Sequence, residues 1–227
     1  IHSRGMKPTP LTLAAIVAVV VTYIRAIFFT PLEAVQGPAQ KILYVHAPAA
    51  WVAFMAFGHV AVASALYLWL REERLDRIAE SSAEVGVVFT TVVLTTGPLW
   101  GRPIWGAYWT WDARLTLTLF LWFIYVAYLV MRGALEDKDV RARYSAVLGI
   151  LGALLIPFIH LSVYLFRTLH PRPILMKPSA PSLPNEMLIT LLLAFASFTL
   201  LYVALLRARY RYAVTRDGAN PPETHNA

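Results

Sequence analysis

The segment 97–131 reads GPLWGRPIWGAYWTWDARLTLTLFLWFIYVAYLVM, and its two parts differ in character. The second part, 113–131, is apolar after Arg114 and has about the ~20 residues that a membrane-spanning helix needs. The first part holds four of the seven tryptophans of the chain and is interrupted by Gly and Pro. This pattern predicts a spanning helix preceded by a tryptophan-rich loop at 100–112.

The composition of the whole chain extends this prediction. Hydrophobic residues make up 58% of the sequence and charged residues only 15%, which excludes a water-soluble globule. We expect an all-α integral membrane protein, a single polytopic domain over 1–227 with a polar tail at 212–227. Its six transmembrane helices are predicted at 11–29, 43–70, 83–99, 113–131, 145–165 and 186–206. The first is predicted to be retained, because no small-residue cleavage site follows it.

The basic residues indicate how the helices are oriented. The 20 Lys and Arg residues outnumber the 13 Asp and Glu residues, which gives a formal net charge of +7. The basic residues lie in short loops rather than on one amphipathic face, so we predict no nucleic-acid partner. The loops at one end of the predicted helices carry most of them. By the positive-inside rule, both termini are expected in the cytoplasm of a bacterial inner membrane. The tryptophan-rich loop, 100–112, then faces outward.

Two histidines are predicted at the same outer face as this loop. His46 lies at the outer start of the second span, and His170 follows the outer end of the fifth. The chain has no Cys, which excludes thioether attachment of haem and thiolate metal ligands. Two neutral imidazoles can hold a six-coordinate haem iron. We therefore expect noncovalent binding of haem b, with His46 and His170 as axial ligands.

The remaining parts of this predicted site are indoles and guanidinium groups. Clustered indoles offer flat apolar surfaces to a porphyrin, although an aromatic belt at the lipid headgroups is the alternative interpretation. Arg can pair with the haem propionates in a bidentate manner. The candidate residues are Trp100, Trp105, Trp109 and Trp111 for the macrocycle, and Arg102, Arg114, Arg167 and Arg172 for the propionates.

Asp112 directly precedes the fourth predicted helix. Its position predicts an N-cap that accepts a backbone N–H, worth about 1 kcal/mol. The alternative role is to fix the loop through Arg114 or to position a partner protein. Pro103 and the loop glycines Gly97, Gly101 and Gly106 are expected to shape the turn.

Two other functions remain open at this point. A two-haem electron-transfer cytochrome would need stacked histidine pairs, but His46 and His59 are about 140° out of phase on a helix. We therefore interpret His59 and His160 as buried, hydrogen-bonded packing residues. A structural adaptor subunit of a transporter, whose aromatic residues only anchor it in lipid, is the second alternative. An adaptor would be colourless when purified, and the cytochrome would hold about two haems per chain.

The run WGRPIWGAYWTWDARLT resembles the tryptophan-rich "WWD" signature of the haem-handling proteins of cytochrome c biogenesis, and the six spans are similar to those of the haem exporter C family. VHAPAAW and RTLHPRP place His46 and His170 where that family has its external haem ligands. The resemblance extends over nearly the whole chain.

The resemblance implies a haem-transfer protein rather than an enzyme. Its expected partners are a periplasmic haem chaperone, the subunits of an ATP-binding-cassette transporter, a very small single-span protein and membrane lipid. The chain has no Walker motif, so a partner must hydrolyse any ATP. A lyase-like contribution to covalent haem attachment on the chaperone would need a general acid or base, and the sequence offers no obvious one.

Overall fold

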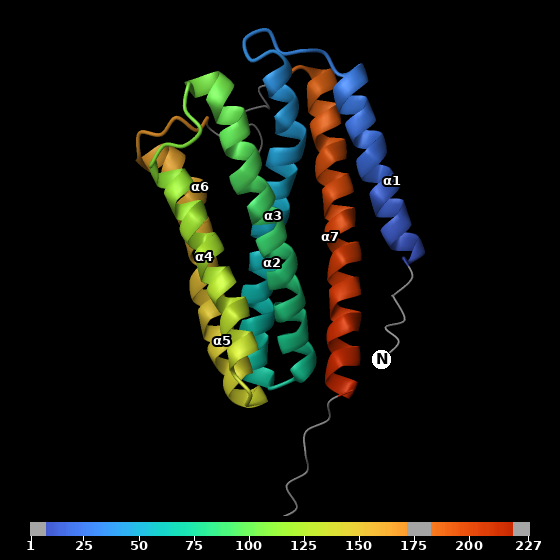
Figure 1. The fold of residues 1–227 in the computed structure, drawn as a ribbon, viewed down its shortest axis with the longest axis vertical. Helices are drawn as coiled ribbons and strands as arrows, with labels where there is room; N and C mark the ends of the chain where they lie inside the picture. Colours follow the sequence, from blue (N-terminus) through green and yellow to red (C-terminus); the bar gives the residue numbers. More distant parts are fainter. Residues whose placement is uncertain (1–7, 172–182, 220–227) are drawn as a thin grey trace, which may run out of the picture.

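A computed structural model describes residues 8–171 and 183–219, and within them the chain is helical (Figure 1). The helices are α1 (Pro10–Ile24), α2 (Leu43–Leu70), α3 (Glu73–Trp105), α4 (Ala113–Ala134), α5 (Lys138–Ala153), α6 (Leu155–Leu165) and α7 (Asn185–Ala219). A π-helical turn, Arg25–Phe29, continues α1, and a 3-10 turn, Pro38–Ile42, precedes α2. These elements form six helical segments long and apolar enough to cross a membrane, which confirms the predicted fold class.

The helices pack side by side as an elongated bundle, with α2 and α3 at its centre (Figure 1). The Phe57 ring of α2 stacks on Tyr125 of α4, with ring centroids 3.7 Å apart. Gly86 of α3 allows this contact, because a Cβ at that position would lie 2.5 Å from the Phe57 ring. The Tyr125 hydroxyl donates a 2.8 Å hydrogen bond to the carbonyl of Gly149 in α5. The core is therefore aromatic and depends on close approach of the helices.

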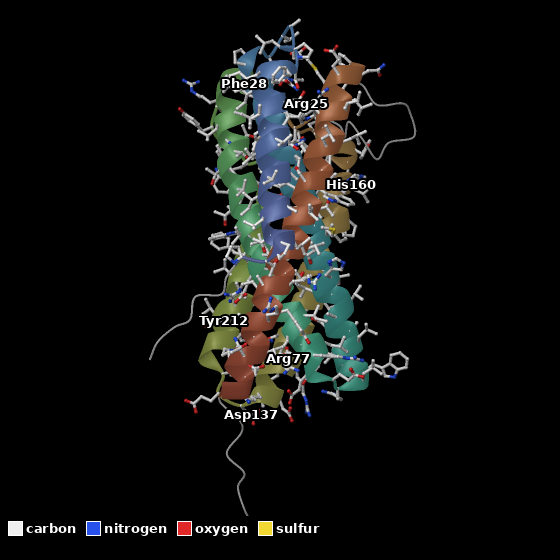
Figure 2. The ribbon with its side chains drawn as sticks, turned by 90° about the vertical axis from the view of Figure 1, so that its right-hand side faces the viewer. Arg25, Phe28, Arg77, Asp137, His160 and Tyr212 are labelled. Atoms are coloured by element: carbon white, nitrogen blue, oxygen red, sulfur yellow. The ribbon has the colours of Figure 1, made fainter. Side chains whose placement is uncertain are left out.

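The two ends of the bundle carry different side chains. One end, here called the arginine end, holds Arg77, Asp137 and Tyr212 (Figure 2). The other end, here called the tryptophan end, holds Arg25 and Phe28, and the chain segments at 30–37 and 106–112 close it (Figures 1 and 2). The helices that contain His46 and the tryptophan-rich segment bring these residues to the tryptophan end.

Ion pairs connect three helices at the arginine end. Arg132 of α4 forms a bidentate pair with Asp76 of α3, at 2.6 and 2.8 Å, and also contacts Glu80 at 3.1 Å. Arg216 of α7 pairs with the same Glu80 at 2.8 and 2.9 Å. The Arg132 side chain is only 4% exposed, so its charge depends on these two carboxylates.

The ion pairs at the arginine end explain why two predicted boundaries differ from the structure. The third helix was predicted at 83–99 but begins at Glu73, and the tail predicted from 212 is helical as far as Ala219. Hydropathy alone does not identify these turns because they are rich in charged residues. Their charges are paired across helices, as the contacts of Glu80 with Arg132 and Arg216 show.

The predicted loop at 100–112 is also too long. Helix α3 continues through Pro98 and Pro103 to Trp105, so the irregular segment covers only 106–112. A proline removes one hydrogen bond from a membrane helix without ending it where neighbouring groups compensate. The helix ends instead at Gly106, whose φ of +77° lies in the left-handed region that favours glycine.

The fifth predicted span, 145–165, is two helices rather than one. Helix α5 ends at Ala153 and α6 begins at Leu155. Pro157 has no N–H to donate to the carbonyl of Ala153, four residues earlier, and its ring crowds that carbonyl. The break therefore follows from a single proline in an otherwise apolar sequence.

Candidate functional site

A pocket of about 180 Å³ lies at the tryptophan end, between α2, α3, α4 and α6. His46 and His170 both line it, although they are far apart in the sequence. Ala53 lines its deeper part, and seven residues of helix separate Ala53 from His46, which corresponds to about 10 Å. Leu121 and Ile159 also line this part. The pocket is thus a cleft that enters the bundle rather than a shallow surface floor.

The two imidazoles face each other across part of this pocket. Their ring centroids are 6.5 Å apart and their planes are tilted by 35°. A metal bound to two imidazoles makes bonds of about 2 Å to each nitrogen, which places the nitrogens about 4 Å apart and the ring centres farther apart. The observed spacing therefore fits one iron between the two rings.

Hydrogen bonds fix which nitrogen of His46 is available. Its Nδ1 lies 2.9 Å from the hydroxyl of Thr96, and that hydroxyl donates its own proton to the carbonyl of Val92 at 2.7 Å. The Thr96 oxygen must then accept from Nδ1–H of His46. This leaves Nε2 of His46 without a proton in the neutral ring, as a metal ligand requires.

The same arrangement holds for His170. Its Nδ1 lies 2.9 Å from the carbonyl oxygen of Pro171, which can only accept, so Nδ1 carries the proton and Nε2 is free. Burial of the ring, followed by the positive charge of Arg114, lowers the pKa of His170 from 6.5 to about 4, against the opposite effect of the Pro171 carbonyl. His170 is therefore neutral at physiological pH.

Small residues and indoles hold the imidazoles in place. A Cβ at Gly97 would lie 3.2 Å from Cε1 of His46, so this glycine leaves room for the ring. Trp100 meets His46 edge to face, with centroids 5.8 Å apart, and its Nε1–H donates to Gln36 at 3.0 Å. Trp105 lies beside His170 at 6.4 Å. Two of the predicted indoles thus contact the two predicted ligands.

Trp109 and Trp111 have different environments. Trp109 lines the pocket, and its buried Nε1–H has no hydrogen-bond partner among the described residues. Trp111 does not line the pocket; it is 76% exposed and packs edge to face on Trp109, with centroids 5.6 Å apart. The prediction of one common role for the four indoles is therefore too simple.

The four predicted cations also separate. Arg114 lines the pocket, and its buried Nη1 has no partner among the described residues. Arg102 is exposed, donates to the carbonyl of Gly106 and lies over the Tyr108 ring at 5.7 Å. Arg167 is exposed and lies outside the pocket lining, and Arg172 lies outside the described residues. Among the described candidates, Arg114 is the one placed to meet an anion in the pocket.

Asp112 is the N-cap of α4, as predicted. Its Oδ1 accepts the backbone N–H of Leu115 at 3.0 Å, and its Oδ2 accepts from the hydroxyl of Thr110 at 3.3 Å. No ion pair joins Asp112 to Arg114 in the described residues. Asp112 therefore sets the start of α4 and leaves the guanidinium of Arg114 free to face the pocket.

The other two described histidines lie outside the pocket lining. His59 is hydrogen-bonded to the Tyr202 hydroxyl at 2.8 Å, as predicted, but it is exposed on the bundle surface rather than buried. His160, which Figure 2 labels, was also predicted to be buried but is half-buried, and its ring centroid lies 6.5 Å from that of Tyr164. His59 is exposed because its position on α2 faces outward, while its Nδ1 reaches Tyr202 of α7.

Sequence reasoning missed two polar supports of the site. Thr96 orients His46 from 50 residues away, and Gln36 holds Trp100 from 64 residues away. Thr and Gln at these spacings carry no local pattern that could have identified them. The apolar residues that line the deeper part of the pocket, Ala53, Leu121 and Ile159, were missed as well, because in the sequence they look like ordinary residues of a membrane span.

Comparison with known proteins is consistent with this geometry. Residues 3–224 match the family model "Heme exporter protein C". The chain belongs to the haem exporter protein C family. It is 37% identical to "Heme exporter protein C" of Haemophilus influenzae, over 86% of this chain and 79% of that protein. Identity to the protein of the same name from Bradyrhizobium diazoefficiens is 40%, over 80% of this chain and 69% of that protein.

A mitochondrial relative is also similar. The chain is 36% identical to the "Putative cytochrome c biosynthesis ccmC-like mitochondrial protein" of Marchantia polymorpha, over 76% of this chain and 73% of that protein. The family match covers all the spanning helices of the described residues and every residue that lines the pocket.

Proposed function

We propose that this protein binds haem b noncovalently at the tryptophan end and passes it to a periplasmic haem chaperone during cytochrome c maturation. The observation that carries the proposal is the facing pair of imidazoles, 6.5 Å apart, each with its Nδ1 hydrogen-bonded and its Nε2 free. This is the arrangement that a low-spin iron with two axial histidines needs. The family name of the relatives supports the same cargo.

The surroundings of the pair suit a porphyrin with two carboxylates. Trp100 and Trp105 offer apolar ring surfaces beside the imidazoles. Arg114 brings a guanidinium group with a buried, unpartnered N–H to the same pocket, and the Trp109 indole adds a second donor of that kind. We assign the haem propionates to Arg114.

The orientation follows from the charges. The tryptophan end faces the periplasm and the arginine end faces the cytoplasm of the inner membrane, with both termini cytoplasmic, in agreement with the positive-inside rule. The chaperone then approaches from the periplasm. The subunits of an ATP-binding-cassette transporter and a small single-span protein complete the complex, and this chain serves as a haem-transfer protein rather than a catalyst.

The haem content of the purified protein tests this proposal. We expect one b-type haem per chain, a low-spin absorption spectrum, and loss of the haem to acid extraction because no covalent bond holds it. A colourless protein that also fails to take up added haem would favour the structural adaptor. Two haems per chain would favour the electron-transfer cytochrome.

A further inference from the structure

The turn formed by residues 30–37 lies beyond the ends of α1 and α2 at the tryptophan end (Figure 1). It presents two large apolar side chains, Leu32 at 59% and Val35 at 90% exposure. No other large hydrophobic residue in the described ranges is as exposed as Val35. The exposed hydrophobic residues of the spans can face lipid, but these two side chains lie in a turn outside the spans.

The turn is held rigidly. The carboxylate of Glu33 accepts the backbone N–H groups of Val35, at 2.9 Å, and of Gln36, at 2.5 Å. The N–H of Gly37 bonds to the carbonyl of Glu33 at 2.9 Å, and the φ of Gly37 is +56°, which favours glycine. The Val35 side chain is therefore presented in a fixed position.

A lysine fixes the start of the same turn. Nζ of Lys41 donates to the carbonyl of Ala26 at 2.7 Å and to the carbonyls of Thr30 and Pro31. The Ala26 carbonyl lies in the π-helical turn, where Pro31, five residues on, has no N–H to donate, and the other two carbonyls follow that turn. Both ends of the turn are thus tied to the bundle.

The turn also borders the pocket. Gln36 lines the pocket and accepts the 3.0 Å hydrogen bond from the Trp100 indole. Trp100 in turn contacts the His46 ring. A protein seated on Val35 would therefore stand next to the imidazole pair.

The exposed side chains of the turn fit a protein better than lipid hydrocarbon. The adjacent spans end at Phe29 and begin at Pro38, so Leu32 and Val35 lie between them. The non-helical backbone of the turn and the carboxylate of Glu33 between the two side chains disfavour the hydrocarbon region. Phe28 and Phe29, at 73% and 70% exposure, end the span and suit the lipid interface instead.

We propose that Leu32 and Val35 form a docking ledge for the protein that accepts the haem, which rests on the proposed function above. The ledge is one apolar surface beside the pocket. The exposed Trp111, which packs on Trp109, is a second one from a separate segment. The partner must carry a complementary apolar face beside its haem-accepting groups. The ledge would hold the partner beside the pocket while the partner supplies the ligands that replace His46 and His170 on the iron.

The test uses the full-length, haem-loaded protein in lipid nanodiscs and the purified apo form of the periplasmic haem chaperone from the same genome. The double variant Leu32→Asp/Val35→Asp should keep the haem content and spectrum of the wild type. Its transfer at limiting chaperone concentration should fall by about tenfold or more, which corresponds to about 1.4 kcal/mol, because two apolar interface anchors are lost. Raising the chaperone concentration should restore the rate.

Two further variants serve as controls. Val140→Asp places one carboxylate, half the charge added by the double variant, on a 38% exposed valine at the arginine end and should transfer at the wild-type rate. Val35→Leu keeps the ledge apolar and should also transfer normally.

Several outcomes would overturn the ledge. Wild-type transfer by the double variant would do so while leaving the haem-transfer function intact. Loss of haem from the double variant would show that the turn only supports the pocket. A defect seen in nanodiscs but not in detergent would assign Leu32 and Val35 to lipid. Absence of transfer from the wild type itself would contradict the proposed function instead.

Discussion

The two ends of this bundle differ in how their buried guanidinium charges are paired. At the arginine end, Arg132 is enclosed and neutralised by Asp76 and Glu80. At the tryptophan end, Arg114 and Trp109 have buried N–H groups without partners among the described residues. A buried donor without a partner costs about 1–3 kcal/mol. Single unpaired nitrogens also occur at the arginine end, as Nε of Arg132 shows, but there the guanidinium charge itself is neutralised by carboxylates. What distinguishes Arg114 is that it has no ion pair among the described residues and lines the pocket, which suits it to bind an anionic ligand.

The largest expected effect is on the arginine end. Arg132→Ala leaves Asp76 without its buried partner, while Glu80 keeps Arg216, and breaking a buried pair in this way costs about 3–5 kcal/mol. Thermal unfolding in detergent should show a large fall in the midpoint, while the folded fraction keeps its haem spectrum. Arg114→Ala, which removes no ion pair, should leave the midpoint near that of the wild type. Equal losses for the two variants would contradict the distinction between the two ends.

The second effect concerns the ligands. The double variant His46→Ala/His170→Ala should lose haem affinity by more than the 10–100-fold that loss of an outer hydrogen-bond partner costs. Titration with haem, followed by absorbance, measures this. His59→Ala, which lies outside the pocket, is the control. A normal low-spin spectrum in the double variant would show that other residues hold the iron.

Thr96→Val tests the orientation of His46. The change keeps the shape of the side chain but removes the acceptor for Nδ1–H, so haem affinity should fall by about 10–100-fold. Thr95→Val is a matched control on the same helix, because Thr95 is exposed and bonds only to the carbonyl of Thr91. If both variants bind haem equally well, Thr96 does not position the ligand.

The indoles should affect transfer more than binding. The triple variant Trp105→Ala/Trp109→Ala/Trp111→Ala should deliver haem slowly to the chaperone while retaining part of it through the histidines. Trp111→Ala alone should bind haem normally, because its side chain lies outside the pocket lining and is 76% exposed. Unimpaired delivery by the triple variant would reduce the segment to a lipid belt.

The smallest effect is that of pH. The pKa of His170, lowered to about 4, keeps this ligand neutral well below the usual 6.5. Haem retention should therefore stay constant from pH 8 to about pH 5 and fall as the pH approaches 4, when protonation competes with iron. The sign is the same for stability, since the unfolded chain takes up this proton below pH 6.5 and the folded chain does not until about pH 4. Release of haem centred near pH 6.5 would contradict the lowered pKa of His170.

The sequence predicted the number of spans well and the ends of the helices poorly. Six apolar runs are visible because each crosses a bilayer of fixed thickness. The helical turns at 73–82 were missed because their charges become acceptable only when α4 and α7 supply partners, as Arg132 does for Asp76. Pro98 and Pro103 led to a predicted end of the third helix that is too early, because membrane helices tolerate proline.

By itself, the sequence determined the fold class and the N-cap at Asp112, and it singled out the two histidines that line the pocket, because apolar length, local capping and the family signature are written in consecutive residues. Only the tertiary structure distinguished Arg114 from Arg102, placed Trp111 outside the pocket and brought Thr96 to His46. These distinctions depend on which side chains meet across separate helices. Helix packing decides such contacts, and no spacing along one chain segment encodes them.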